Sequence, residues 1–139
     1  MIAIGCGHGG FALKQEVMRH LDELGLAYQD FGAYSEESGD DPVYGEAGAR
    51  AVAAGECERG ILICGTGIGI SISANKVKGI RAALCGDCYS AEMTRRHNDA
   101  NILAMGARVL GPGPAPKIVD PILTTASEGR RHAPPRALL

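Results

Sequence analysis

Tryptophan is absent from this sequence of 139 residues, and other aromatic residues are few, with four tyrosines and two phenylalanines. An excess of positive charge is missing as well, because 14 lysines and arginines stand against 16 aspartates and glutamates. Proteins that bind nucleic acid usually combine a basic surface with aromatic side chains on which bases stack. We therefore expect no nucleic-acid partner.

Long apolar runs are also missing. No stretch reaches the roughly 18 uninterrupted apolar residues of a membrane-spanning helix, and Met1–Ile4 leads into Gly5 without a basic leader. The five cysteines are an odd number and too sparse for a disulfide framework, which is typical of a reducing compartment. We expect a cytoplasmic protein with no membrane contact.

Short apolar runs alternate with longer stretches of helical periodicity, the pattern of successive βα units around a parallel sheet. We expect strands over residues 1–5, 27–31, 60–64, 80–85 and 101–105. We expect helices over residues 11–24, 42–55, 70–77, 89–96 and 115–126. The sequence thus predicts an α/β fold, a Rossmann-like three-layer α/β/α sandwich with a five-stranded parallel sheet. It forms a single domain over residues 1–139, with a basic tail over about 127–139.

The run from Gly60 to Ser71 carries the strongest chemical signal. An apolar strand ends at Cys64 and passes directly into glycines that lead into a helix. Only residues without a Cβ let consecutive backbone N–H groups approach a ligand closely, and such groups at a helix start attract anions and favour a thiolate. The pattern predicts a catalytic thiol beside an anion-binding turn. Taken alone, Cys64 could equally be a small buried side chain at a tight turn.

Other segments are expected at the same edge of the sheet. In open α/β sheets the carboxyl ends of the strands meet at one edge, where ligands bind. The segments that follow strands there are 6–8, 64–69, 85–88 and 106–108.

Seven motifs run in order along nearly the whole chain. They are Ile-Gly-Cys-Gly-His-Gly-Gly-Phe at 4–11, Ile-Cys-Gly-Thr-Gly-Ile-Gly-Ile-Ser at 63–71, Ala-Asn-Lys at 74–76, Gly-Ile-Arg-Ala at 79–82, Tyr-Ser-Ala at 89–91, His-Asn-Asp at 97–99 and Gly-Ala-Arg-Val at 106–109. Together they resemble the ribose-5-phosphate isomerase B family, which also includes galactose-6-phosphate isomerase subunits. The resemblance implies an aldose–ketose isomerase that needs no metal or other cofactor and works through a cis-enediol.

The resemblance also implies catalytic roles. By position, Cys64 is the base that moves a proton between C1 and C2, Thr66 hydrogen-bonds the reacting oxygens, and His97 opens the sugar ring. A base of this kind is needed because a C–H next to a carbonyl is only weakly acidic. Backbone amides of the turn can stabilise the enediolate oxygen, and they belong to Gly65, Gly67, Ile68 and Gly69.

Substrate contacts follow from the same resemblance. His8, Arg108 and Arg131 match positions that hold the phosphate, for which guanidinium groups are well suited. Asn98 matches a substrate-binding residue and Tyr44 a residue that lines the sugar pocket. The implied substrates are D-ribose 5-phosphate and D-ribulose 5-phosphate. The implied assembly is a homodimer with active sites at the interface, or a tetramer.

Two positions depart from the pattern of the family. Family members usually carry aspartate immediately before the first histidine, where this chain has Gly7. The missing carboxylate leaves open a hexose or tetrose phosphate as substrate, or a homologue without catalysis. In the tail, Pro135 occupies the position of a second family arginine, and Arg136, one residue later, is the candidate to replace it.

Two other functions compete with this interpretation. Cys85 and Cys88 form a C-x-x-C motif where a strand meets a helix, as in thioredoxin-like redox sites. A Rossmann-type nucleotide-binding module is the other alternative, but Ile70 stands where G-x-G-x-x-G requires glycine. The remaining candidates are interpreted structurally: His20, Arg95 and Arg96 as helix surface, and Cys6 and Cys57 as packing.

Overall fold

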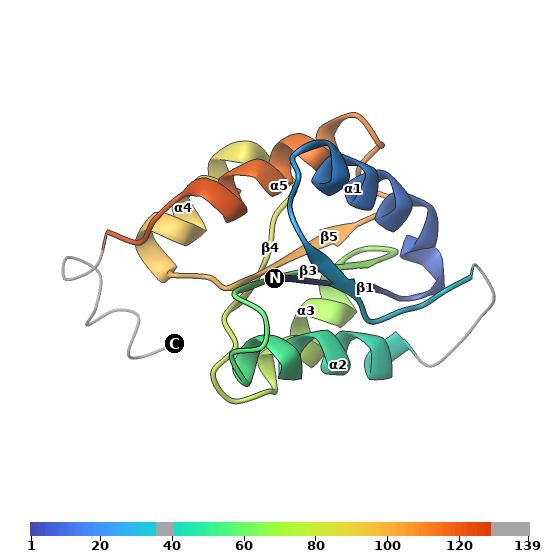
Figure 1. Ribbon diagram of the computed structural model, residues 1–139, viewed down its shortest axis with the longest axis horizontal. Helices are drawn as coiled ribbons and strands as arrows, with labels where there is room; N and C mark the ends of the chain where they lie inside the picture. Colours follow the sequence, from blue (N-terminus) through green and yellow to red (C-terminus); the bar gives the residue numbers. More distant parts are fainter. Residues whose placement is uncertain (36–40, 129–139) are drawn as a thin grey trace.

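The computed structural model describes residues 1–35 and 41–128, with the side chains of Asp41 and Pro42 left out. Five parallel strands form one sheet (Figure 1), and their order across it is β2-β1-β3-β5-β4. The strands are β1 (Ile2–Cys6), β2 (Tyr28–Asp30), β3 (Arg59–Cys64), β4 (Ala82–Leu84) and β5 (Ile102–Gly106). The helices are α1 (Phe11–Glu23), α2 (Asp41–Ala53), α3 (Ile68–Asn75), α4 (Cys88–Asn98) and α5 (Pro114–Thr124), and a short 3-10 helix, η1 (His8–Gly10), precedes α1.

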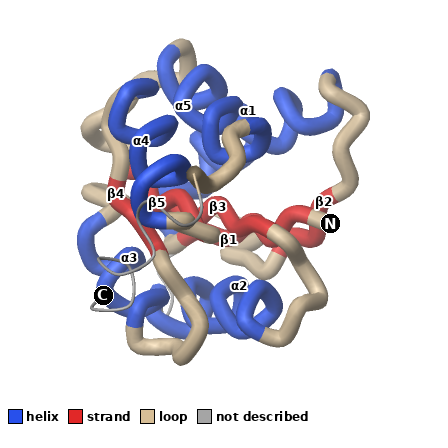
Figure 2. The backbone as a smooth tube through the Cα atoms, turned by 90° about the vertical axis from the view of Figure 1, so that its left-hand side faces the viewer, coloured by secondary structure: helices blue, strands red, loops and turns tan. Residues whose placement is uncertain are grey.

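The predicted α/β/α sandwich is confirmed. Figure 2 shows the sheet between α1, α4 and α5 on one side and α2 and α3 on the other. The expected strands and helices all form, with ends displaced by one to a few residues. In the described ranges, no helix is long and apolar enough to cross a membrane.

The sheet changes its direction of winding between β1 and β3. The chain goes outward from β1 to β2, and then returns to place β3 on the other side of β1. Ligands of open α/β sheets bind outside the carboxyl ends of the strands at such a switch point. The topology therefore predicts a ligand-binding site at the residues that follow β1 and β3.

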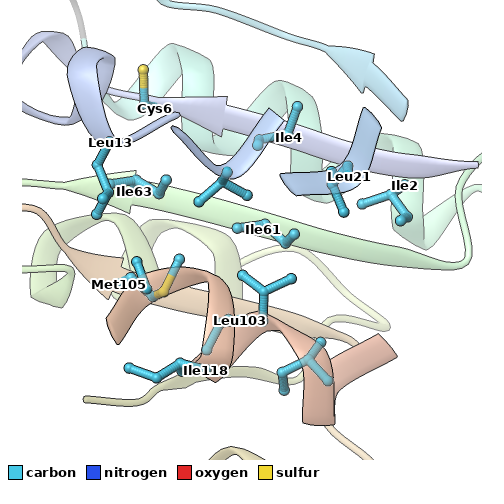
Figure 3. Close-up of a cluster of buried hydrophobic side chains, with 14 of the residues drawn as sticks. Ile2, Ile4, Cys6, Leu13, Leu21, Ile61, Ile63, Leu103, Met105 and Ile118 are labelled. Carbon is cyan, nitrogen blue, oxygen red and sulfur yellow. The ribbon is translucent and has the colours of Figure 1, made fainter. Parts of the chain in front are cut away.

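Side chains alternate between the two faces of the sheet because successive residues of a strand point in opposite directions. The face toward α1 and α5 carries large apolar side chains, among them Ile4, Ile63 and Met105 (Figure 3). The face toward α2 and α3 carries smaller ones, such as Ala3 and Ala104. Burial on both faces explains why the central strands are almost continuously apolar in sequence.

Glycines bring α2 close to its neighbours. A β-carbon added at Gly48 would lie 3.0 Å from Cδ2 of Leu62 in the sheet. One added at Gly45 would lie 2.8 Å from Cγ1 of Ile70 in α3. The absence of side chains at these two positions lets α2 pack tightly against both the sheet and α3.

Two of the arginine and histidine interpretations from sequence need correction. Arg95 is not a surface residue: it is only 2% exposed, because the last turn of α4 packs between the end of α5 and the start of β5. His20 is partly buried, and its Nε2 lies 2.6 Å from Oδ1 of Asp120, which joins α1 to α5. Arg96 lies on the outer side of α4, with a side chain 43% exposed.

A buried ion pair fastens α1 to the end of β2. Lys14 is fully buried on the apolar stripe of α1, and its Nζ donates to both carboxylate oxygens of Asp30 at 2.7 and 2.8 Å. The same ammonium donates to the carbonyl oxygen of Ala33 at 2.5 Å. Asp30 retains some contact with solvent, whereas Lys14 has none.

This difference in exposure predicts an asymmetric effect on stability. Asp30→Asn leaves a fully buried ammonium without its counterion, and we expect a loss of about 3 kcal/mol in the free energy of unfolding. Lys14→Met should cost less, because it fills the space with an apolar chain and leaves a carboxylate that water can reach. Urea unfolding at pH 7 and equal protein concentrations measures both. An equal or larger loss for Lys14→Met would contradict the explanation.

Candidate active site

The turn after β3 lies at the switch point of the sheet and carries Cys64, Gly65, Thr66, Gly67, Ile68 and Gly69. Gly67 has a φ of 80°, and a β-carbon there would lie 2.7 Å from the carbonyl carbon of Met105. A β-carbon at Gly106 would lie 2.6 Å from the carbonyl carbon of Thr66. Glycine is therefore required on both sides of this contact, which seats the turn against the end of β5.

Two backbone hydrogen bonds lock the same contact. The N–H of Ala107 donates to the carbonyl oxygen of Cys64 at 2.8 Å, and the N–H of Arg108 donates to that of Gly65 at 2.9 Å. The loop after β5 thus continues alongside the turn after β3. As a result, Arg108 is carried to the same place as the thiol.

The thiol of Cys64 is half-buried and faces the start of α3. The N–H of Gly67 donates to its Sγ at 3.1 Å, and the N–H of Ile68 donates to Oγ1 of Thr66 at 3.2 Å. α3 begins at Ile68, so the sulfur lies at the positive end of that helix. The sulfur therefore faces a backbone hydrogen-bond donor at the start of a helix.

Two candidate phosphate ligands, His8 and Arg108, belong to segments that meet this turn. His8 is the first residue of η1, and a β-carbon at the next residue, Gly9, would lie 3.7 Å from the backbone nitrogen of Gly65. The exposed Arg108 has its side chain against Gly65, with Cδ 3.6 Å from a β-carbon built there. The segment after β1 and the side chain of Arg108, after β5, therefore flank the turn that carries Cys64.

Gly7 and Tyr44 lie at the same edge of the sheet. Gly7 is buried just after β1, with its N–H donated to the carbonyl oxygen of Ile63 at 2.9 Å. Tyr44 lies near the start of α2, where its ring packs on Gly32, the residue whose carbonyl oxygen accepts the N–H of Cys6. A β-carbon at Gly32, which has a φ of 102°, would lie 2.7 Å from Cδ1 of that ring.

His97 and Asn98 are not with the other candidates. They end α4, on the side of the sheet where β5 begins (Figure 1). The carbonyl oxygen of Asn98 accepts a hydrogen bond of 2.6 Å from Nε of Arg81, just before β4. β5 spans five residues, so about 13 Å of strand separates its two ends. Within one chain, His97 therefore lies at the amino ends of the strands and Cys64 at their carboxyl ends.

Arg131 and Arg136 lie outside the described residues. The described chain ends at Glu128, and this last segment is bonded to the end of α4. The N–H of Glu128 donates to the carbonyl oxygen of Arg96 at 3.0 Å, and Nε of Arg95 donates to that of Thr125 at 2.9 Å.

The C-x-x-C motif has the wrong electrostatics for a redox site. Cys85 is buried, and its burial, together with the charge of Asp87, raises the pKa of its thiol to about 11. The redox alternative required a lowered pKa at this residue. Cys88 is exposed at the start of α4, and its Sγ lies 3.4 Å from the carbonyl oxygen of Lys117.

Among the residues that the structure describes, no group of three or more histidine, cysteine, aspartate and glutamate side chains converges where a metal could bind. The groups that meet at the carboxyl edge are a thiol, backbone amides, a hydroxyl and basic side chains.

Known proteins match both the sequence and the fold. A family model described as Ribose/Galactose Isomerase matches residues 2–137. Ribose-5-phosphate isomerase B of Escherichia coli strain K12 is 53% identical over 131 residues, which cover 94% of this chain and 88% of that protein. D-erythrulose-4-phosphate isomerase of Pectobacterium atrosepticum is 43% identical over 136 residues, covering 96% of this chain and 88% of that protein. The structure of Clostridium thermocellum ribose-5-phosphate isomerase B superposes with a TM-score of 0.96 at 52% identity, covering 99% and 93% of the two chains.

The contrast between Cys85 and Cys88 predicts selective alkylation. With iodoacetamide at pH 8, we expect Cys88 to react in the native protein and Cys85 to stay protected, because Cys85 is buried and protonated. Peptide mapping by mass spectrometry measures both rates. Labelling of Cys85 as fast as Cys88 would show that the thiol of Cys85 is not buried as described.

The raised pKa of Cys85 also implies that the free energy of unfolding falls between about pH 9 and pH 11. In this range the unfolded chain loses the thiol proton of Cys85 and the folded chain keeps it.

Proposed function

The chain belongs to the ribose/galactose isomerase family and is an isomerase, and from that premise we propose that it interconverts D-ribose 5-phosphate and D-ribulose 5-phosphate. One observation carries the proposal: the Cys64 sulfur accepts an N–H at the start of α3, beside the side chain of Arg108. A base, an anion-stabilising turn and a cation for the phosphate thus lie together.

The chemistry requires one proton to move between adjacent carbons. Cys64, as thiolate, removes the proton from C2 of the open-chain aldose; the electrons of that bond form the C1–C2 double bond of a cis-enediolate, and the electrons of the C1 carbonyl move onto its oxygen. Return of the proton to C1, together with transfer of the hydroxyl proton from the oxygen on C2 to the oxygen on C1, gives the ketose, so no external oxidant or reductant is consumed. Thr66 and the backbone amides of residues 65–69 stabilise the oxygen charge as it develops.

We propose that each active site is shared between two copies of the chain. Ring opening needs an acid–base group next to the sugar, and His97 is the family candidate. Since His97 and Cys64 lie at opposite edges of one sheet, the His97 and Asn98 of one copy must serve the Cys64 of the other. A homodimer is the smallest assembly that completes the site, and a tetramer could pair two such dimers.

Apolar side chains on the outer side of α3 and β4 support such a dimer. Ile68 and Ile72 lie four residues apart on one face of α3 and are 51% and 56% exposed. Leu84 of β4, which is an edge strand, is exposed beside them. Ile68 follows the Cys64 turn directly, and a cavity of about 480 Å³ beside β4 is lined by Arg81 and Asn98. A two-fold contact through this surface would bring the turn of one copy toward the α4 end of the other.

The phosphate is then held from both sides. His8 and Arg108 come from the copy that supplies Cys64. Glu128 is hydrogen-bonded to the end of α4, and Arg131 and Arg136 follow it in the sequence. We therefore assign both arginines to the copy that supplies His97. Tyr44 lines the sugar pocket from α2. We expect the enzyme to act in the cytoplasm, since its five cysteines form no disulfide in the described chain.

A sugar phosphate of four or six carbons is the second candidate substrate. Gly7 offers no carboxylate where the family usually has aspartate, and the D-erythrulose-4-phosphate isomerase relative is 43% identical. The difference in pocket polarity at this one position is the feature that favours a different sugar.

The assay for the reaction follows ketose formation from ribose 5-phosphate by purified, chelator-treated protein. We expect turnover that Cys64→Ala lowers at least about a hundredfold, because Cys64 is the group that takes the proton in the proposed mechanism. Tetrose and hexose phosphates in parallel identify the preferred sugar. An unchanged rate in folded Cys64→Ala protein would remove the thiol from the mechanism.

The shared site predicts recovery of activity on mixing two inactive variants. Cys64→Ala and His97→Ala, unfolded and refolded together in equal amounts, should regain about a quarter of the wild-type activity, because half of the dimers are mixed and each holds one complete site. Either variant refolded alone is the control. Failure of the mixture, with dimers formed and folded, would contradict the exchange of His97 between copies.

A further inference from the structure

Arg95 is the most completely buried charged side chain that the proposed chemistry does not use, apart from Lys14. Its guanidinium points across the end of α4 rather than outward. Nε donates to the carbonyl oxygen of Thr125 at 2.9 Å, and Nη1 donates to Oδ1 of Asp99 at 2.8 Å and to the carbonyl oxygen of Ala100 at 2.7 Å. One side chain therefore joins the segment that follows α4, through the Asp99 carboxylate and the Ala100 carbonyl oxygen, to the segment that follows α5.

Each of these bonds acts on a segment next to His97 and Asn98. Asp99 and Ala100 follow Asn98 directly, and Asp99 has a left-handed conformation with a φ of 52°. The backbone N–H of Asp99 caps α4, and the Arg95 guanidinium holds its carboxylate as well. The bond to Thr125 fixes the end of α5, from which the chain continues toward Arg131.

We propose that Arg95 is a positioning residue, which sets the orientation of His97 and Asn98 toward the active site of the partner copy. The inference rests on the proposed function, in which His97 acts across the dimer interface. Arg95 touches no reacting atom. Its effect passes through the turn at residues 98–100, where Nη1 of Arg95 binds the Asp99 carboxylate and the Ala100 carbonyl oxygen, while Nε of Arg81 binds the carbonyl oxygen of Asn98.

The neighbouring Arg96 is a matched control. It has the same charge and side chain and lies in the same turn of α4, but it pairs on the surface with Glu92 and Glu128. Exposed pairs of this kind contribute little to stability. Arg96→Met thus removes an equal charge from α4 while it leaves the bonds of Arg95 to Asp99, Ala100 and Thr125 in place.

Mixed dimers distinguish positioning from general stabilisation. One chain carries Cys64→Ala and the other His97→Ala, each with its own affinity tag, so that sequential purification yields dimers with one complete site. In that site the Cys64→Ala chain supplies His97. Arg95→Met is then introduced into one chain or the other, and turnover of ribose 5-phosphate is compared at equal dimer concentration.

We expect the two placements to differ. Arg95→Met in the chain that supplies His97 should lower kcat by about a hundredfold, the scale of a misplacement near 1 Å. The same substitution in the chain that supplies Cys64 should change kcat less than about twofold. Arg96→Met should leave turnover unchanged in both placements.

Equal losses in the two placements, or no loss in either, would overturn the positioning role. If the mixed dimer is inactive before any change at Arg95, the shared site itself is wrong, and the role of Arg95 falls with it. If the Arg95→Met chain does not fold, Arg95→Lys replaces it in the same mixed-dimer experiment. It keeps the charge but lacks the planar fork, so it should show a smaller loss with the same dependence on placement.

Discussion

The contact between the Cys64 turn and the end of β5 is the constraint on which the rest of the site depends. Thr66 lies so close to Gly106 that neither Gly67 nor Gly106 has room for a side chain. This contact aims the thiol at the start of α3 and carries the loop after β5 past Gly65. The chemistry of the thiol and the position of Arg108 are therefore set by one backbone contact.

The direction of the helices explains why His97 and Cys64 lie far apart within one chain. In a parallel sheet every connecting helix returns from the carboxyl edge to the amino edge, so residues at the end of α4 cannot reach the residues that follow β3. In the dimer that we propose, a two-fold axis would bring the amino edge of one sheet toward the carboxyl edge of the other. Catalysis would then depend on association of the two copies.

Periodicity in the sequence was sufficient for the layered fold, because the buried strands are apolar on both faces and the glycine turns mark their ends. The glycine-rich run around Cys64 also predicted a turn at the carboxyl edge. Arg95 was misjudged, because a helical arginine is exposed unless tertiary contacts surround it, and its partners Ala100 and Thr125 are backbone groups. Lys14 offered a clearer signal: it shares the apolar stripe of Val17 and Leu21. The separation of His97 from Cys64 depends on where α4 ends, which local patterns do not convey.

The unequal packing of the two layers has a consequence for how such a sequence can change over time. Between the sheet and α2, glycines at positions 45 and 48 leave no volume for a larger residue. On the other face, isoleucine, leucine and methionine can exchange with compensation among neighbours, since total volume is what that layer must conserve. We therefore expect substitutions to be tolerated more readily in the layer of α1 and α5 than in the layer of α2 and α3, which supports the Cys64 turn.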